Sequence, residues 1–210
     1  MKLIPLFPLE IVVFPGEALN LHIFEARYKQ LINDCKEEDL IFGIPFYQKD
    51  RKLEYGSTVR LKKIAKMYSD GRMDIHTEGI NPFEVKRYVK SFKKKLYPGG
   101  YIEELYWDKE GSSDHYELIR GMLGELYSFM NISKLPYEPY DEFTTFSIGH
   151  KVGFNQNQEY HLLQIPGEQE RQEYMIQHMK TLIPKVKEME EMRRKIQMNG
   201  HFKNIIPPNL

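Results

Sequence analysis

The stretch LIPLFPLEIVVFPGEALNLHIFEARY, residues 3–28, decides the fold of this chain. Pro5 and Pro8 remove backbone donors and fix φ, so the first part of the stretch is predicted to be an extended edge strand. Pro15 and Gly16 then force a turn, and the residues beyond them alternate between apolar and polar side chains as strand residues do. The pattern predicts two strands around a rigid corner, followed by a helix.

The region from Leu40 to Tyr106 has the composition and spacing of β-strands. Short apolar or alternating runs are separated by turn residues, and the Asp-Gly pair at 70–71 tolerates the positive φ values that a tight hairpin needs. The alternation changes between residues 61 and 64, which is typical of a β-bulge, and residues 78–83 are interpreted as a second corner. About six or seven strands with tight turns predict a small closed or partly closed barrel.

The second half of the chain is predicted to be helical. Asp114 and Glu117 match the N-cap and N3 positions of a first helix. Further helices are predicted from about Asp141 and over residues 156–163. The last helix must either kink or restart at Pro184. Its apolar residues recur every seven positions, at Met175, Leu182, Met189 and Ile196.

The composition is that of a soluble globular protein. The 210 residues include 30 basic and 30 acidic side chains, so the chain as a whole has no attraction to nucleic acid or to an anionic membrane. No apolar run is long enough to cross a membrane and no signal peptide is indicated, which favours a cytoplasmic location. The single cysteine, Cys35, falls within the helix after Tyr28 and is expected to be a buried or idle thiol.

The sequence carries no motif for catalysis or for cofactor binding. It has no glycine-rich phosphate loop, and its seven histidines show no zinc-binding spacing, so neither a metal nor a cofactor is expected. His22 is interpreted as a structural hydrogen-bonding residue. Glu25 and Arg27 are most simply explained by helix capping and an ion pair to the barrel. Phe14 and Phe24 are expected to be core residues.

Three motifs near the N-terminus resemble a known family. They are PLFPL at 5–9, VVFPG at 12–16 and LHIFEARY at 21–28. In this order and at this spacing they are similar to the opening of the Lon N-terminal domain, the substrate-recognition module of the ATP-dependent Lon proteases.

The resemblance continues along most of the chain. Residues 55–64 and 69–88 resemble the hairpin pattern of that family, although Asn81-Pro82 stands where a charged pair is usual. Residues 161–179 resemble one of its helical stretches, so the likeness covers about residues 1–187. It implies an α+β fold, in which a PUA-like β-pseudo-barrel is followed by an α-helical subdomain that ends in a long C-terminal helix. The expected boundaries are 1–110 for the barrel, 111–199 for the helical subdomain and 200–210 for a tail.

The function that the resemblance implies is binding without catalysis. The ATPase and protease domains of a full-length Lon are absent from the sequence, so a stand-alone, non-enzymatic module is expected. Such a module would bind unfolded or hydrophobic polypeptide segments, or act as an adaptor in protein quality control. A separate ATP-dependent protease is a possible partner.

The aromatic residues suggest where binding would occur. The chain has 14 tyrosines, 12 phenylalanines and one tryptophan, more than a barrel and a small helical bundle are expected to bury. Each of them taken singly is explained by a place in the core. As a set, those near predicted strand ends and loops are predicted to line a groove between barrel and helices: Tyr47, Tyr55, Tyr97, Tyr101, Tyr106 and Trp107.

The end of the last helix is a second candidate surface. Its methionine-rich face could offer an adaptable contact to a partner or to a second copy of the chain, giving a homo-oligomer. The residues concerned are Met189, Met192, Ile196 and Met198. The alternative is a solvated helix face opposite a packed stripe.

Two other functions remain open. The run from Lys86 to Lys95 interleaves basic and aromatic residues, as proteins that bind RNA do, although the neutral charge makes RNA a weaker candidate and such a run also protects an edge strand. Small-molecule binding is the other alternative, because a Lon-like domain in the cereblon family accompanies a tryptophan-lined ligand module. The zinc-binding cysteines of that module are missing here.

Overall fold

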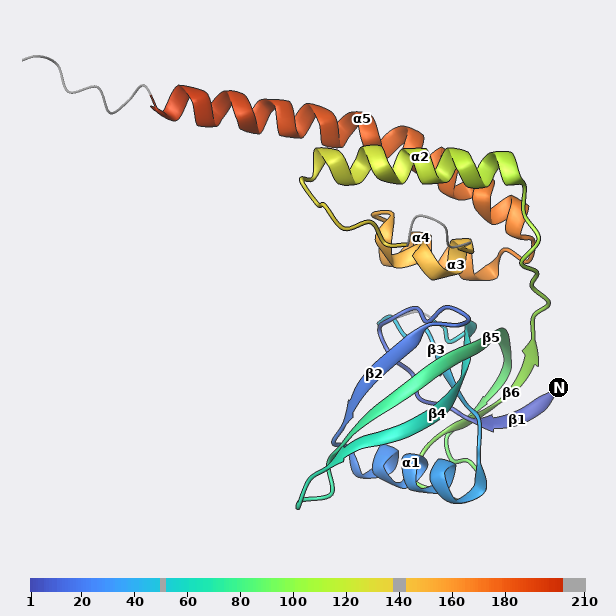
Figure 1. Ribbon diagram of the computed structural model, residues 1–210. Helices are drawn as coiled ribbons and strands as arrows, with labels where there is room; N and C mark the ends of the chain where they lie inside the picture. The colour runs from blue at the N-terminus through green and yellow to red at the C-terminus, as the bar shows by residue number, and fades with distance from the viewer. Residues whose placement is uncertain (50–51, 138–142, 202–210) are drawn as a thin grey trace, which may run out of the picture.

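The computed structural model describes residues 1–49, 52–137 and 143–201, the last four of them by their backbone only. A β-barrel forms one part of the molecule, and a group of helices lies beyond one end of it (Figure 1). The mixed α+β fold with a long helix at its C-terminal side is therefore confirmed.

Six strands of the described residues form one antiparallel sheet. They are β1 (Lys2–Pro5), β2 (Ala18–Ile23), β3 (Phe42–Pro45), β4 (Tyr55–Met67), β5 (Met73–Val89) and β6 (Gly99–Glu104). They follow the order β1-β6-β5-β4-β3, and β2 pairs with β5. Beyond β1, Leu6 and Leu9 bridge to Gly43 and Phe46, which brings the two ends of the sheet together.

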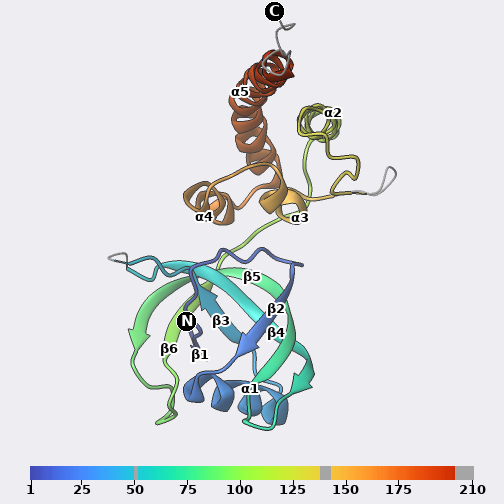
Figure 2. The ribbon, with the colours of Figure 1, turned by 90° about the vertical axis from the view of Figure 1, so that its left-hand side faces the viewer.

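Helices cover both ends of this barrel (Figure 2). They are α1 (Ala26–Glu38), α2 (Ser113–Phe129), α3 (Thr145–Ile148), α4 (Gln156–Gln164) and α5 (Glu168–His201), with a 3-10 turn at Gly149–Lys151. α1 lies across one end. At the other end, α3 and α4 lie next to the barrel, and α2 and α5 lie farther out.

The prolines near the N-terminus act as predicted. β1 pairs with β6, and the chain then stays extended through the bridges at Leu6 and Leu9. The run that contains Val13 and Phe14 is not a strand; it crosses the upper end of the barrel with both side chains buried. The hairpin at 69–72 is confirmed, with Gly71 at a φ of 78°.

The second corner predicted at residues 78–83 is wrong. β5 runs through it as one strand that pairs with β2, β4 and β6 in turn. Gly79 is needed for a close approach instead of a turn, because a Cβ there would lie 2.2 Å from the backbone oxygen of Phe14. The bulge predicted between residues 61 and 64 is present as a shift of register between β4 and β5.

Two details of the helical part also differ from the prediction. α2 is capped by Ser112, whose hydroxyl accepts from the His115 N–H, and not by Asp114. In place of a long helix from about Asp141, the described residues form the short α3 and the 3-10 turn; residues 138–142 lie outside the described part. α5 continues through Pro184 as a single helix.

Separate apolar cores lie at the two ends of the barrel. At the lower end α1 packs on the strands, and Cys35 is buried there, which raises the pKa of its thiol to about 12. At the upper end Phe14 is fully buried and stacks on Phe146 with ring centres 5.3 Å apart. Phe24 was expected in the core, but it is 63% exposed beside the ring of His22, because the helix of α1 begins only after it.

His150 joins the barrel to the helices. Its ring lies 4.7 Å from that of Phe14, and its two nitrogens contact Glu17 at 3.1 Å and Glu159 of α4 at 2.8 Å. Burial disfavours the imidazolium, but the hydrogen bonds to the two carboxylates outweigh it and raise the pKa of His150 to about 9. A charged histidine therefore holds the two parts together at neutral pH.

Candidate functional site

The segment between β6 and α2 is held against the start of α5 by one buried arginine. The Arg171 side chain is completely buried and pairs with Glu168 at 2.8 Å, and Glu168 also accepts from the Thr145 backbone N–H and hydroxyl. The remaining donors of the guanidinium reach backbone carbonyl oxygens of Ile165, Pro166 and Asp108. Because its donors meet acceptors, this buried charge fixes three chain segments relative to one another.

The segment itself supplies further contacts to α5. The Asp108 carboxylate accepts from the Glu168 N–H at 2.7 Å, and the Gln172 side-chain oxygen accepts from the Ser112 N–H at 2.8 Å. Residues 108–112 therefore form a rigid rim beside the first turns of α2 and α5.

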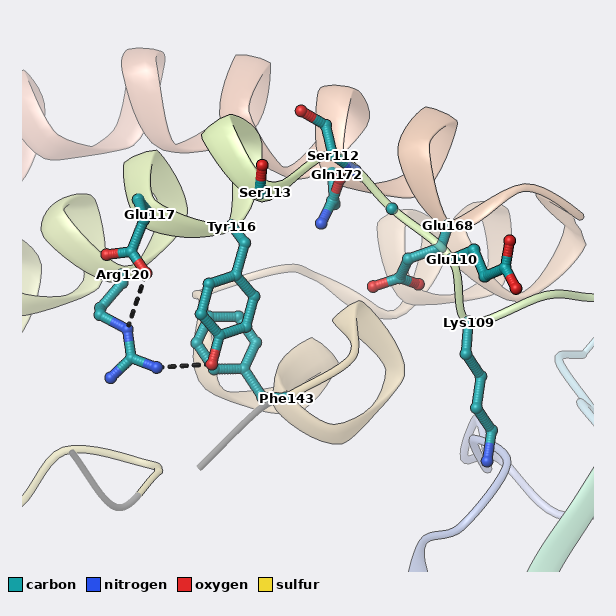
Figure 3. Close-up of a pocket in the computed structure, with 11 residues that line it drawn as sticks. Lys109, Glu110, Ser112, Ser113, Tyr116, Glu117, Arg120, Phe143, Glu168 and Gln172 are labelled. Atoms are coloured by element: carbon teal, nitrogen blue, oxygen red, sulfur yellow. Dashed lines mark hydrogen bonds and ion pairs between the residues drawn. The ribbon is translucent and has the colours of Figure 1, made fainter. Parts of the chain in front are cut away.

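A pocket of about 720 Å³ opens at this rim (Figure 3). Its side chains come from the connecting segment, from the first two turns of α2, from Phe143 and from the start of α5. They are Lys109, Glu110, Gly111, Ser112, Ser113, Tyr116, Glu117, Arg120, Phe143, Glu168 and Gln172.

Stacked aromatic rings form one wall of the pocket. The rings of Tyr116 and Phe143 lie 4.3 Å apart, and Tyr137 packs on Phe143 at 5.0 Å. The Arg120 guanidinium lies 4.9 Å from the ring centre of Tyr116 and 4.8 Å from that of Tyr137, and it donates to the Tyr116 hydroxyl. Cation–π contacts to these rings hold the wall in place.

Charges of both signs surround this wall. Arg120 forms a long ion pair with Glu117 at 3.9 Å, and on the opposite side of the pocket Glu110 follows Lys109, whose ammonium lies 5.5 Å from the ring centre of Trp107. Burial raises the pKa of the Tyr137 hydroxyl, which donates to the Arg120 carbonyl oxygen and stays neutral at physiological pH. The pocket thus offers aromatic faces between acidic and basic groups.

Two of the six predicted groove aromatics lie at the junction of barrel and helices. Trp107 packs on Phe146 with ring centres 5.5 Å apart, and its indole N–H donates to Asn81. Tyr55 packs on Tyr160 of α4. Both are half-buried in the upper core, and neither lines the pocket.

The other four predicted aromatics are spread over the surface and the lower core. Tyr97 is fully buried at the α1 end, where its hydroxyl donates to Asp34 at 2.6 Å, so the prediction that it lines a groove is wrong. Tyr101 lies on β6 under the Arg87 guanidinium. Tyr47 and Tyr106 are exposed, and Tyr106 lies two residues before the rim of the pocket.

The sequence did not single out the rings that line the pocket. Tyr116 falls within the first predicted helix and Phe143 within the second, and a place in the core explains an apolar ring in either helix. Their role depends on contact between segments far apart in the chain, to which Arg120 also contributes. The available signal was the density of tyrosine and proline after Leu135.

The end of α5 leaves its apolar side chains uncovered. α2 accompanies α5 only as far as Lys187, whose ammonium lies 5.9 Å from the ring centre of Phe129, and α5 then continues past it (Figure 1). The exposed fractions are 69% for Met189, 57% for Met192 and 65% for Ile196. The side chain of Met198 lies outside the described residues.

Internal contacts engage much of the basic run from Lys86 to Lys95. Lys86 pairs with Glu84 and Glu103, and Lys95 pairs with Asp34. Phe92 is buried in the lower core. Within the described part of the chain, no group of acidic, histidine or cysteine side chains is placed to hold a metal ion, and no helix is long and apolar enough to cross a membrane.

Comparisons with known proteins agree with this architecture. Residues 3–193 match the family described as the ATP-dependent protease La (LON) substrate-binding domain. A crystal structure of a Lon N-terminal domain protein from Xanthomonas campestris is 20% identical, with a TM-score of 0.66 over 84% of this chain and 98% of that chain. The N-terminal domain of a Mycobacterium avium complex Lon protease is 13% identical, with a TM-score of 0.62 over 85% of this chain and 98% of that one. The comparison with curated proteins gave no match.

The fold is therefore that of a Lon N-terminal domain, a class of α+β module that binds protein substrates. This chain belongs to the Lon substrate-binding domain family.

Proposed function

We propose that this protein is a non-catalytic module that binds exposed, unfolded or apolar segments of other proteins. The observation that carries the proposal is the pocket at the start of α2, where a wall of stacked aromatic rings stands between charges of both signs. Membership of the Lon substrate-binding family supports the same class of ligand.

The lining suits a polypeptide better than a single compact ligand. Aromatic faces accept apolar side chains of many shapes, and the nearby acidic and basic groups can pair with charges of either sign along a chain. The volume of about 720 Å³ lies within the range typical of ligand sites. The rigid rim at residues 108–112 means that little ordering of the protein itself is required, which favours affinity.

The setting that fits this proposal is protein quality control in the cytoplasm. In it, the module would hold a client segment directly or hand it to a separate ATP-dependent protease. Neither role requires the module to hydrolyse ATP or a peptide bond, so the pure protein is expected to leave both intact.

The experiment is a binding titration with a permanently unfolded probe. Fluorescently labelled α-lactalbumin, reduced and carboxymethylated so that it cannot refold, is titrated with the full chain, and native α-lactalbumin serves as the negative probe. Tyr116→Ala and Phe143→Ala should each weaken binding about tenfold, because each removes one member of the aromatic wall.

The matched control is Tyr174→Ala, which removes a comparable ring that stacks on Phe154 outside the pocket. It should bind the probe as the wild type does, with circular dichroism confirming that all three variants are folded. Equal affinity of the pocket variants and the wild type would refute the pocket as the site, and failure of the wild type to bind the probe would refute the function.

A further inference from the structure

The last three to four turns of α5 have no covering element among the described residues. The fourteen positions after Lys187 extend over about 21 Å at the usual helical rise. This segment continues a helix whose first half is packed, so it needs no nucleation, but its own apolar side chains gain nothing from burial. It presents three large apolar side chains to solvent, Met189, Met192 and Ile196.

Charges flank these apolar side chains in a self-complementary order. Glu188 and Lys195 are seven residues apart, so they lie on the same flank of the apolar stripe, two helical turns from each other. Glu190 lies toward the packed side of α5, where its side chain is only 20% exposed, and it pairs with the exposed Arg193 at 3.5 Å within the chain. The exposed flank of the stripe thus carries an acidic residue first and a basic residue after it.

An antiparallel second copy pairs the charges of this flank between the two chains. A two-fold axis that passes between residues 191 and 192 places Glu188 of one copy opposite Lys195 of the other. The same axis brings the apolar stripes face to face. A parallel copy would set the acidic block beside the acidic block and the basic block beside the basic block, which is unfavourable.

The shape of the molecule favours the same arrangement. The end of α5 projects away from the barrel, so antiparallel pairing leaves the two barrels at opposite ends of the dimer (Figure 1). In this register Ile196 of the second copy lies near residue 187, where α2 ends with the half-exposed Met130 and Ile132. On both sides of the two-fold axis, the interface can therefore extend from the end of α5 in one copy to the end of α2 in the other.

We infer that the end of α5 is a self-association surface, and that two copies of this chain pair antiparallel through residues 188–196. The inference does not rest on the proposed peptide-binding function, because the aromatic pocket lies at the other end of α2. The short contact places the dimer among weak, reversible interfaces that bury less than about 1,200 Å².

Sedimentation velocity of the full chain from low to several hundred micromolar tests the inference. The wild type should shift from monomer to dimer over this range, and the shift should weaken as salt rises because exposed charges are screened. Glu188→Lys with Glu190→Lys, and separately Arg193→Glu with Lys195→Glu, should each lower the association constant at least about tenfold, because like charges then meet. An equimolar mixture of the two double variants should form a heterodimer.

The control variant is Glu37→Lys with Glu38→Lys, which makes the same change of net charge as the Glu188/Glu190 double variant, at exposed positions of α1, and should dimerise as the wild type does. Three results would overturn the inference: a wild type that stays monomeric throughout, reversed variants that associate as well as the wild type, or a mixture that does not associate. A monomeric wild type whose affinity for carboxymethylated α-lactalbumin falls on Ile196→Ser would assign the surface to client segments instead.

Discussion

The first and second halves of α5 carry one seven-residue apolar repeat but have opposite surroundings. Met175 is fully buried and Leu182 half-buried, whereas Met189 and Ile196 are mostly exposed. The repeat predicts a helix with an apolar stripe, and it does so equally for both halves. The apolar stripe is covered only where α2 runs beside α5. The same sequence pattern therefore forms part of the core in the first half and a binding surface in the second.

The largest effect is expected from the buried ion pair at the start of α5. Glu168→Ala leaves the Arg171 guanidinium buried without its counter-ion, which should lower the free energy of unfolding by about 3–5 kcal/mol. Glu188→Ala, at an exposed position of the same helix, should change it by less than about 0.5 kcal/mol. Urea denaturation of the two variants checks this difference, and similar losses would refute the structural role assigned to the first half.

A pair of methionine substitutions gives the next largest difference. Met179 is fully buried, so Met179→Ala should cost about 2–5 kcal/mol of unfolding free energy through lost burial and an unfilled cavity. Met192→Ala removes the same atoms from an exposed site and should cost less than about 0.5 kcal/mol. The comparison needs dilute protein, because self-association would bury Met192 and make the loss of unfolding free energy for Met192→Ala larger. A large loss of unfolding free energy for Met192→Ala in the monomer would mean that the end of α5 packs on its own chain.

The smallest effect depends on pH and concerns only the part of the molecule before residue 188. The pKa of His150 is raised in the folded state, so its contribution is fully present below the unfolded pKa of about 6.5 and is lost as pH rises through about 9. The contribution is about 1 kcal/mol, because a third of the side chain is exposed and solvent screens the pair.

Thermal unfolding of the wild type and of His150→Gln from about pH 6 to about pH 10 measures that contribution. The wild type should be the more stable at the acidic end, and the difference should disappear at the alkaline end. A chain truncated after Lys187 should show the same dependence, since the end of α5 touches neither Glu17 nor Glu159. A difference that grows with pH would contradict the charged bridge.

Local sequence signals predicted the elements well where backbone chemistry alone decides them. The prolines at positions 5 and 8, the Asp-Gly hairpin and the repeat in α5 all behave as their residues require. Gly79 shows the limit of that reasoning, because a glycine needed for close approach to Phe14 looks the same in sequence as a glycine needed for a turn.

Burial and site composition could not be predicted in the same way. Tyr97 is predicted at a surface groove but is buried, and Phe24 is predicted in the core but is exposed. Burial of either residue depends on which end of the barrel α1 covers, and the alternation of side chains along the chain does not reveal that. The aromatic wall joins Tyr116, Tyr137 and Phe143 from separate segments around one arginine. Such a site exists only once the chain is folded, so a count of aromatic residues could indicate a binding surface but could not locate it.

Hydrogen exchange along α5 at two protein concentrations tests the difference between its halves most directly. We predict that backbone amides from 171 to 183 are strongly protected at both concentrations, because packing on α2 and α3 covers them. Amides from 189 to 197 should exchange rapidly in dilute protein and become protected only at high concentration, when the second copy binds. Equal protection of both halves in dilute protein, or a second half that never gains protection, would contradict the account.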